Sequence, residues 1–293
     1  MKRLGQLLLL FLAGCSAPEP PPASVMVVAG VEDRERTTAM LEEFTAATGI
    51  PVDLRFGNSP ELVDALVAKT GDPADVLISD AVADVWRAGD RGALRPVQSE
   101  ALRDHHPSLR DDESLWFVHE IRPMAILHAG QTTPGQVSYE DLGQAAFSGR
   151  VCLSSSTLAD NRLLLANLID SKGNKVTERL VRLWVRNLAR PPFPSQTELR
   201  AALRAGDCDY GIASNAHTVF GNWARTPPPR AYAATAVGIG RHAVNADGAQ
   251  ALADWLLRNR SVRIPSYEAL PHAGIAGWRD EEASLLAERA GYR

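Results

Sequence analysis

The sequence predicts an α/β protein built from two lobes, and three observations support this prediction. The chain has 293 residues, of which 45% are hydrophobic and 23% charged, a balance typical of a folded protein. Short runs rich in β-branched residues alternate with segments whose apolar residues recur at helical spacing. The sequence has no internal repeat of fixed period, which argues against a repeat architecture. We therefore expect mostly parallel sheets with helices on their faces.

The overall charge excludes one class of function. Lys and Arg total 31 against 35 Asp and Glu, so the formal net charge is -4. A nucleic-acid-binding protein needs a basic surface to neutralise phosphates. We therefore expect no nucleic acid among the partners of this protein.

Residues 1–14 have the form of an export signal. Lys2 and Arg3 precede an unbroken apolar run over residues 7–12, far shorter than the ~20 residues of a membrane-spanning helix. The sequence Leu-Ala-Gly-Cys at residues 12–15 resembles the bacterial lipobox. This resemblance implies cleavage before Cys15 and attachment of a lipid to it.

The segment after the signal is expected to be a tether. Residues 15–24 begin with the lipid-bearing Cys15 and continue with four prolines and no apolar periodicity, which favours an extended, polyproline II-like spacer. The alternative is a plain linker in a soluble exported protein. With the anchor, the mature protein is expected on the outer side of the cell membrane or in the periplasm, attached to either membrane.

The first part of the folded chain repeats strand and helix three times. Residues 25–29 are a continuous run typical of a strand buried on both faces. Residues 37–48 carry apolar side chains at helical spacing and end before Gly49, a common residue after a helix. The same rhythm predicts strands at 52–56 and 75–78 and helices at 60–68 and 81–88.

The remaining elements are spaced less regularly. Residues 117–127 form a long extended stretch, and residues 176–188 form a helix with Leu180 and Trp184 on its apolar side. Further elements are expected as a helical turn at 139–142, strands at 151–153, 211–213 and 235–239, and helices at 158–171, 216–223 and 249–257.

With Cys15 used for the lipid, Cys152 and Cys208 are left as an even pair in an exported, oxidising setting. Each lies near a predicted short strand. We predict a disulfide between them, with two free buried thiols as the alternative.

Polar residues follow the carboxyl ends of several predicted strands, where ligands bind in open α/β sheets. Helix N-termini at this edge favour anions, although each polar residue could also be only a helix cap. The candidate ligand-binding residues at these edges, beside residues 30–33, are Asn58, Ser59, Ser79, Asp80, Ser154, Ser155, Ser156 and Asn215.

Arg122 is a further candidate, because it interrupts the extended stretch, where an unpaired charge is costly to bury. It either clamps a ligand oxyanion or pairs with Glu120 or an Asp between the lobes. His119 and Glu120 begin an apparent zinc motif, but Pro123 stands where its second His belongs. No Gly-x-Ser-x-Gly elbow or phosphate-binding loop is present.

The order of these features resembles the periplasmic solute-binding proteins of ABC importers, specifically the ferric iron-binding group. The segments that carry the resemblance are residues 27–49, 74–78 with Trp86, 93–97, 116–117, 139–142, 149–156, 206–209, 235–240 and 249–257.

This resemblance implies a periplasmic-binding-protein-like fold whose lobes are joined by crossing hinge strands and close on a ligand. Lobe one would comprise residues 25–118 plus 235–265, and lobe two residues 119–234. Residues 266–293 would form a C-terminal tail packed on the lobes.

The chain departs from this group at one place. Ferric binders of the group carry adjacent tyrosines after the strand that follows the Cys-Asp segment, whereas Ala216 and His217 stand there in this chain. Phenolate oxygen suits a hard trivalent cation, so the exchange argues against bare ferric iron. We expect a chelated metal, an oxyanion or a small organic acid instead, with His217 as a candidate ligand-binding residue or a softer-metal ligand.

The resemblance thus implies an extracytoplasmic solute-binding lipoprotein, with a small polar ligand and an ABC importer permease as partners. We expect a monomer that is not an enzyme and has no cofactor apart from a metal ion or anion carried as cargo. One alternative is an exported serine hydrolase that uses Ser154, Ser155 or Ser156 with His217. The other is a degenerate binding protein that acts as a sensor or scaffold.

Overall fold

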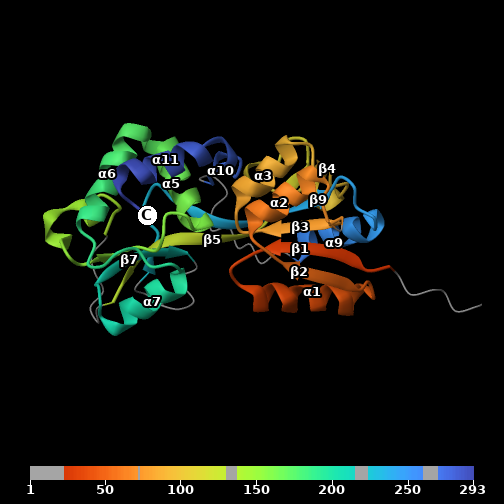
Figure 1. The fold of residues 1–293 in the computed structure, drawn as a ribbon, viewed down its shortest axis with the longest axis horizontal. Helices are drawn as coiled ribbons and strands as arrows, with labels where there is room; N and C mark the ends of the chain where they lie inside the picture. Colours follow the sequence, from red (N-terminus) through yellow and green to blue (C-terminus); the bar gives the residue numbers. More distant parts are fainter. Residues whose placement is uncertain (1–22, 72, 130–136, 215–223, 260–269) are drawn as a thin grey trace, which may run out of the picture.

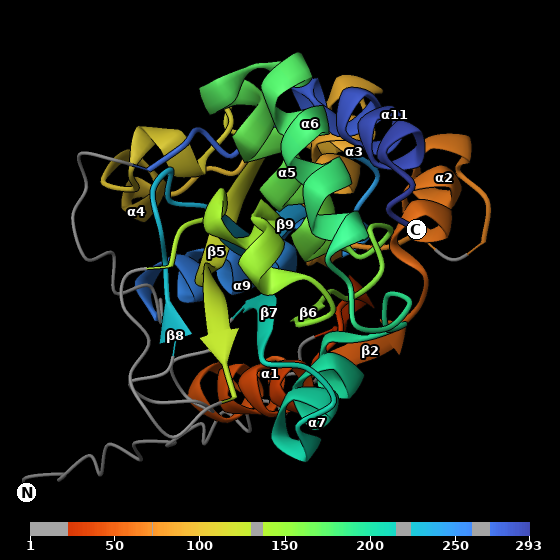
Figure 2. The same ribbon diagram turned by 90° about the vertical axis from the view of Figure 1, so that its left-hand side faces the viewer.

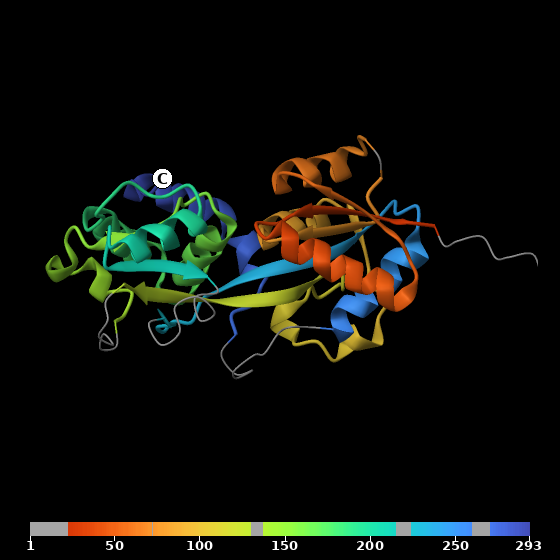
Figure 3. The same ribbon diagram turned by 90° about the horizontal axis from the view of Figure 1, so that it is seen from below.

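The computed structural model describes residues 23–71, 73–129, 137–214, 224–259 and 270–293. They form two lobes that lie side by side (Figure 1). The long strand β5 (Trp116–His128) runs from one lobe into the other, and β9 (Tyr232–Gly240) pairs with it in the antiparallel direction (Figure 3). No helix within these ranges is long and apolar enough to cross a membrane.

Lobe one is the part built on the first half of β5 and on β9. Its other strands are β1 (Val25–Gly30), β2 (Val52–Phe56), β3 (Val76–Ser79) and β4 (Leu94–Arg95), and the pairing order is β2-β1-β3-β9-β5. The helices α1 (Arg34–Thr48) and α9 (Ala246–Arg258) pack together on one face of this sheet, where Phe44 lies edge-on to Trp255. The helices α2 (Ser59–Ala68) and α3 (Val82–Asp90) cover the other face.

Lobe two is built on the second half of β5. Its other strands are β6 (Val151–Cys152), β7 (Tyr210–Ser214) and β8 (Ala224–Arg225). The helices α5 (Ala159–Lys172) and α6 (Asn174–Arg186) lie on one side of β7, and α7 (Gln196–Ala205) lies on the other (Figure 2). Short helices complete the chain at α4 (Glu100–Arg103), η1 (Pro107–Leu109), η2 (Asp141–Gly143) and η3 (Ala145–Phe147).

The C-terminal segment contacts both lobes. The helix α11 (Asp280–Ala290) packs on α5 and α6, whereas α10 (Ile275–Trp278) lies between α3 and α5 (Figure 1). Arg162 of α5 forms an ion pair with Asp280 at the start of α11. The tail therefore rests on lobe two and reaches lobe one through α10.

The strand directions differ from the expected mostly parallel sheets. Within the described ranges, three strand pairs are parallel and five are antiparallel. The reason is that β5 and β9 cross between the lobes, and each described strand that pairs with them runs antiparallel to its partner. The expected lobe boundaries at 118/119 and 234/235 fall inside these two strands, whereas residue 265 and the expected helix at 216–223 lie outside the described residues.

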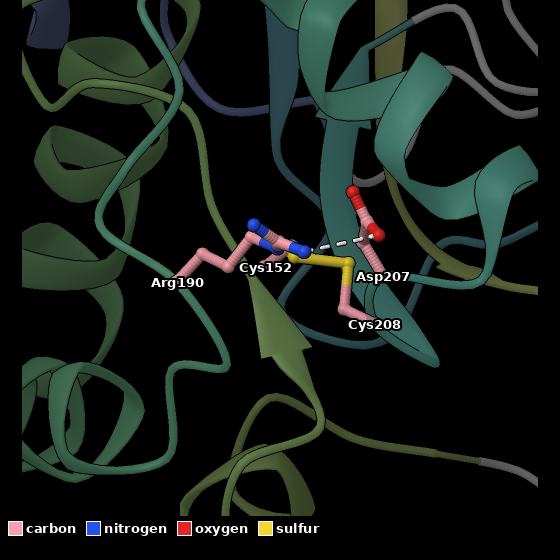
Figure 4. Close-up of a disulfide and its surroundings, with 4 residues drawn as sticks. All are labelled: Cys152, Arg190, Asp207 and Cys208. Atoms are coloured by element: carbon pink, nitrogen blue, oxygen red, sulfur yellow. Dashed lines mark hydrogen bonds and ion pairs between the residues drawn. A yellow bond between two sulfur atoms is a disulfide. The ribbon is translucent and has the colours of Figure 1, made fainter.

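The predicted disulfide is present in lobe two. Cys152 at the end of β6 and Cys208 just before β7 are joined, with their Cα atoms 6.0 Å apart (Figure 4). Both cysteines are buried against Leu199 and Leu203 of α7. The bond therefore ties the strand pair β6–β7 together beneath α7.

Candidate functional site

A cavity of about 700 Å³ lies where the two lobes meet. It is lined by the start of α1, the end of β3, the crossing strands β5 and β9, and parts of α5, α7 and β7. Among the described residues, seven carboxylates and four guanidinium groups line this interlobe cavity. They are Glu32, Asp33, Glu35, Glu43, Asp80, Glu120 and Asp160, with Arg34, Arg36, Arg122 and Arg200.

Asp80 brings the end of β3 into the cavity from lobe one. One carboxylate oxygen, Oδ2, accepts a hydrogen bond from the backbone N–H of Glu32 at 2.9 Å. The other, Oδ1, accepts from the Thr235 hydroxyl of β9 at 2.5 Å. Asp80 therefore holds the β1–α1 loop and a crossing strand at one point.

Asp160 lines the same cavity from lobe two. It lies in the first turn of α5, where the partial positive charge of a helix N-terminus favours a carboxylate. Its Oδ2 accepts hydrogen bonds from Gln196 Nε2 at 2.9 Å and from the Ser214 hydroxyl. This carboxylate thus joins α5 to α7 and to the end of β7.

Arg122 on β5 lies between these two aspartates. Its guanidinium is 3.3 Å from Asp80 Oδ1, 3.5 Å from Asp160 Oδ1 and 3.5 Å from Glu120 Oε2. It also donates to the Thr235 hydroxyl at 2.7 Å. Burial by itself would lower the pKa of Arg122, but the three carboxylates together raise it above its ordinary value. Of the two roles open to Arg122 from sequence, the structure shows pairing with carboxylates.

Arg200 on α7 is held by neutral groups instead. It donates to Gln196 Oε1 at 3.1 Å and to the Ser214 carbonyl at 2.5 Å. Burial lowers the pKa of Arg200, and the nearby Glu32 and Asp160 carboxylates only partly oppose this effect. Its Nε is buried and makes no hydrogen bond within the described part of the chain. Arg200 therefore places a guanidinium in the cavity that can donate hydrogen bonds to an anionic group of a ligand.

Glu32 is the carboxylate of lobe one that faces Arg200. Partial desolvation at the cavity wall, together with the charges of Asp160 and Asp80, raises the pKa of Glu32 above its usual 4.5, while Arg200 and Arg122 lower it. The charged form is therefore disfavoured in the folded state, and this cost is lost as the pH falls through the raised pKa.

We therefore expect Glu32→Gln to raise the melting temperature at pH 7. The gain should shrink as the pH is lowered toward the model-peptide value of 4.5 and below it, because wild-type Glu32 then becomes neutral too. Thermal melts at several pH values test this, with Glu35→Gln on the same cavity wall as the control. A Glu32→Gln variant that melts below wild type at pH 7 would contradict the expectation.

Among the sequence-predicted site residues, Asp80 and Arg122 line the cavity, and so do residues 31–33. Ser59 and Ser79 lie behind the cavity wall, where their hydroxyls hydrogen-bond to each other at 2.6 Å. A Cβ on Gly30 would lie only 2.7 Å from Ser59 Cβ, so glycine is needed for this close approach. Asn58 is exposed at the start of α2.

The three consecutive serines are not part of the interlobe cavity. Ser154 is fully buried and its hydroxyl accepts from Asn161 Nδ2 at 2.9 Å. The Ser155 hydroxyl bonds to that of Thr157, and Ser156 donates to the Tyr292 carbonyl at 3.0 Å. Ser154 thus hydrogen-bonds to the first part of α5, and Ser156 hydrogen-bonds to the C-terminal tail. The predicted site residues Asn215 and His217 lie outside the described residues.

Sequence reasoning missed the contributions of lobe two and of β9. Asp160, Arg200 and Thr235 reach the cavity from places that no strand-end rule identifies. One signal was available for Asp160, an acidic residue in the first turn of a predicted helix that follows a strand. Arg200 and Thr235 carry no comparable signal.

The tyrosines lie elsewhere. Four of the five tyrosines are in the described residues, and none of the four lines the cavity. Tyr210 packs against His128 and Phe147, and Tyr292 donates to the Ser154 carbonyl at 2.6 Å. Tyr139 and Tyr232 are buried. Only Tyr267 lies outside the described residues, so this chain has no two tyrosines that could meet in the cavity as described.

Comparison with known proteins gives a consistent result. A family model described as bacterial extracellular solute-binding protein matches residues 25–264. "Iron uptake protein A1" of Synechocystis is 35% identical over 176 residues, covering 59% of this chain and 49% of the relative. The chain thus spans about half the length of this curated relative.

Two solved structures share the fold. A Trichodesmium protein (IdiA, FutA) in complex with iron and citrate ligands superposes with a TM-score of 0.77 and 24% identity, covering 92% of this chain and 100% of that one. The ferric binding protein of Campylobacter jejuni superposes with a TM-score of 0.79 and 20% identity, with the same coverage. At these identities, the likeness shows the fold alone.

Proposed function

The chain belongs to the bacterial extracellular solute-binding proteins, and from this premise we propose that it is the lipid-anchored binding component of an ABC importer. It takes a small ligand into the interlobe cavity and delivers it to a permease. Members of this family bind and hand over solutes and are not enzymes, which sets the hydrolase alternative aside.

The ligand that fits the cavity best is a chelated metal. A volume of about 700 Å³ is in the usual range for a small-molecule site and far exceeds the space around one bare ion. The surplus of carboxylates on the walls favours positive charge, whereas Arg200 offers a place for an anionic group. A simple oxyanion or organic acid would meet mostly like charge. A metal held by an anionic chelator presents both signs.

The absence of a tyrosine pair among the described residues that line the cavity is the observation that carries this proposal. Bare ferric iron needs several hard anionic donors. In the ferric iron-binding group that this sequence resembles, a pair of tyrosine phenolates supplies them. The names of similar proteins support iron as the metal, since one is an iron uptake protein and another was solved with iron and citrate. Ferric citrate is therefore the probe that we would use first.

Arg200 provides the test of this site. We expect Arg200→Gln to weaken binding of ferric citrate by roughly tenfold to 100-fold, because a charge-assisted hydrogen bond to a carboxylate is lost. Isothermal titration of the purified domain measures the affinity. Arg204→Gln is the matched control, one turn further along α7 and outside the cavity lining. Equal affinity in all three proteins would show that the ligand does not bind at Arg200.

The anchor is tested separately. We expect Cys15→Ala to release the protein from the membrane fraction into the soluble periplasmic or external fraction, because the lipid attachment site is removed. Fractionation followed by immunoblotting measures this distribution, with Ser24→Ala as a control that keeps both the lipobox and the disulfide. Unchanged membrane partition of the Cys15→Ala protein would contradict the lipoprotein assignment.

A further inference from the structure

Arg122 is a positive charge at the point where carboxylates from both lobes converge. Asp80 follows β3 of lobe one, Asp160 begins α5 of lobe two, and Glu120 lies on β5 two residues before Arg122. All four side chains are largely buried, with exposed fractions of 12% for Arg122, 16% for Asp80 and Glu120, and 7% for Asp160. Carboxylates repel one another, so their convergence requires a compensating charge.

The guanidinium occupies the place that a cation would take. Its nitrogens lie 3.3 to 3.5 Å from the three carboxylates, and Thr235 fixes its orientation through a further hydrogen bond at 2.7 Å. Hard cations need their oxygen donors close to one centre, at about 2.3–2.6 Å for Ca²⁺ and about 2.0–2.1 Å for Mg²⁺. Within the described residues, no group of three or more His, Cys, Asp and Glu side chains is arranged in this way. Arg122 therefore pairs with all three carboxylates and spaces them apart, and Arg36 adds a second positive charge 2.7 Å from Glu120 Oε1.

We propose that Arg122 is a specificity-determining residue that keeps free hard cations out of the interlobe cavity. A metal then enters only together with an anionic chelator, which binds groups other than the carboxylates around Arg122. This inference rests on the proposed function in taking the cavity as the ligand site, and it adds the residue that selects between a free and a chelated metal.

Removing the charge of Arg122 should convert the cluster into a cation site. The Asp80 and Asp160 carboxylates then lose their ion pair, while Glu120 keeps its ion pair with Arg36 at 2.7 Å. The two uncompensated charges lie on hard oxygen donors, which suit a trivalent lanthanide. Trp255 lines the same cavity and can sensitise the luminescence of bound Tb³⁺. Emission that is lost in a Trp255→Phe variant therefore reports binding in the cavity, whereas Tb³⁺ bound on the outer surface near the exposed Trp278 would still emit.

The experiment titrates Tb³⁺ into wild type, Arg122→Gln and Arg122→Lys in a buffer without chelators. We expect Arg122→Gln to bind Tb³⁺ roughly 100-fold more tightly than wild type, because a repelling charge in contact with the site has been removed. Arg122→Lys keeps the positive charge and should behave as wild type. Adding Asp160→Asn or Trp255→Phe to Arg122→Gln should abolish the gained affinity and the emission, respectively.

Equal Tb³⁺ affinity in wild type and a folded Arg122→Gln variant overturns the proposal. If circular dichroism shows that Arg122→Gln does not fold, the wild-type titration decides, because sensitised Tb³⁺ binding that Asp160→Asn abolishes would mean that Arg122 excludes nothing. The absence of such wild-type binding, with exclusion kept in Arg122→Lys, supports the proposal. The titration uses no ferric citrate, so failure of the ligand assignment would appear only in the ferric citrate measurement.

Discussion

Replacing Asp160 with alanine is expected to weaken ferric citrate binding roughly 30-fold or more and to lower the free energy of unfolding by about 3 kcal/mol. The reason is that one carboxylate accepts from Arg122 at 3.5 Å, from Gln196 at 2.9 Å and from the Ser214 hydroxyl. Without it, a buried guanidinium loses its partner in lobe two. Gln196 and Ser214, which also position Arg200, lose their acceptor.

The matched control lies on the same helix. Asp170, with 48% of its side chain exposed, is 3.9 Å from Arg279 and is not among the residues that line the cavity. Asp170→Ala removes the same kind of side chain, yet an exposed ion pair contributes at most about 1 kcal/mol. Urea unfolding and titration calorimetry measure both quantities. An Asp160→Ala protein with wild-type affinity would show that Asp160 does not position Arg200 for the ligand.

Removal of the disulfide is the second large effect. The double variant Cys152→Ala, Cys208→Ala is expected to lose about 4 kcal/mol of unfolding free energy, because the bond closes a loop with a sequence separation of 56. This expected loss of unfolding free energy refers to the protein without ligand. It should be largest in lobe two, where the bond lies beneath α7 and among Leu199 and Leu203.

The control is Cys15→Ala, which removes the cysteine that takes no part in the disulfide. Denaturant unfolding of the oxidised protein, of the reduced protein and of both variants measures the effect. The reduced wild type should match the double variant, and Cys15→Ala should match the oxidised wild type. Two alkylatable thiols at residues 152 and 208 in unreduced mature protein would show that the bond does not form.

Local patterns predicted the elements because each is encoded within a short window. The run at residues 25–29 and the spacing over residues 37–48 correspond to β1 and α1, apart from a shift of three residues at the start of the helix. The antiparallel crossing of β5 and β9 was not predictable in the same way. Trp116 pairs with Gly238, and no local pattern encodes a register over such a separation.

The residues of the candidate site also divide into those that a local pattern predicts and those that long-range contacts bring in. Asp80 was predictable because ligands bind at the carboxyl ends of strands, whereas its partner Thr235 is 155 residues away. The serines at 154–156 satisfy the same rule, but the docked C-terminal tail uses them, as the bond from Ser156 to the Tyr292 carbonyl shows. A rule about strand ends cannot foresee which edge another segment covers.

A ferric citrate titration of the mature domain, followed by tryptophan fluorescence and visible absorbance, tests the central claim most directly. We expect saturable binding at one site, seen as a change in the fluorescence of Trp255 beside the cavity. We expect no phenolate-to-iron charge-transfer band, because none of the four described tyrosines lines the cavity. A strong band of this kind with stoichiometric retention of iron and no retained citrate would contradict the account.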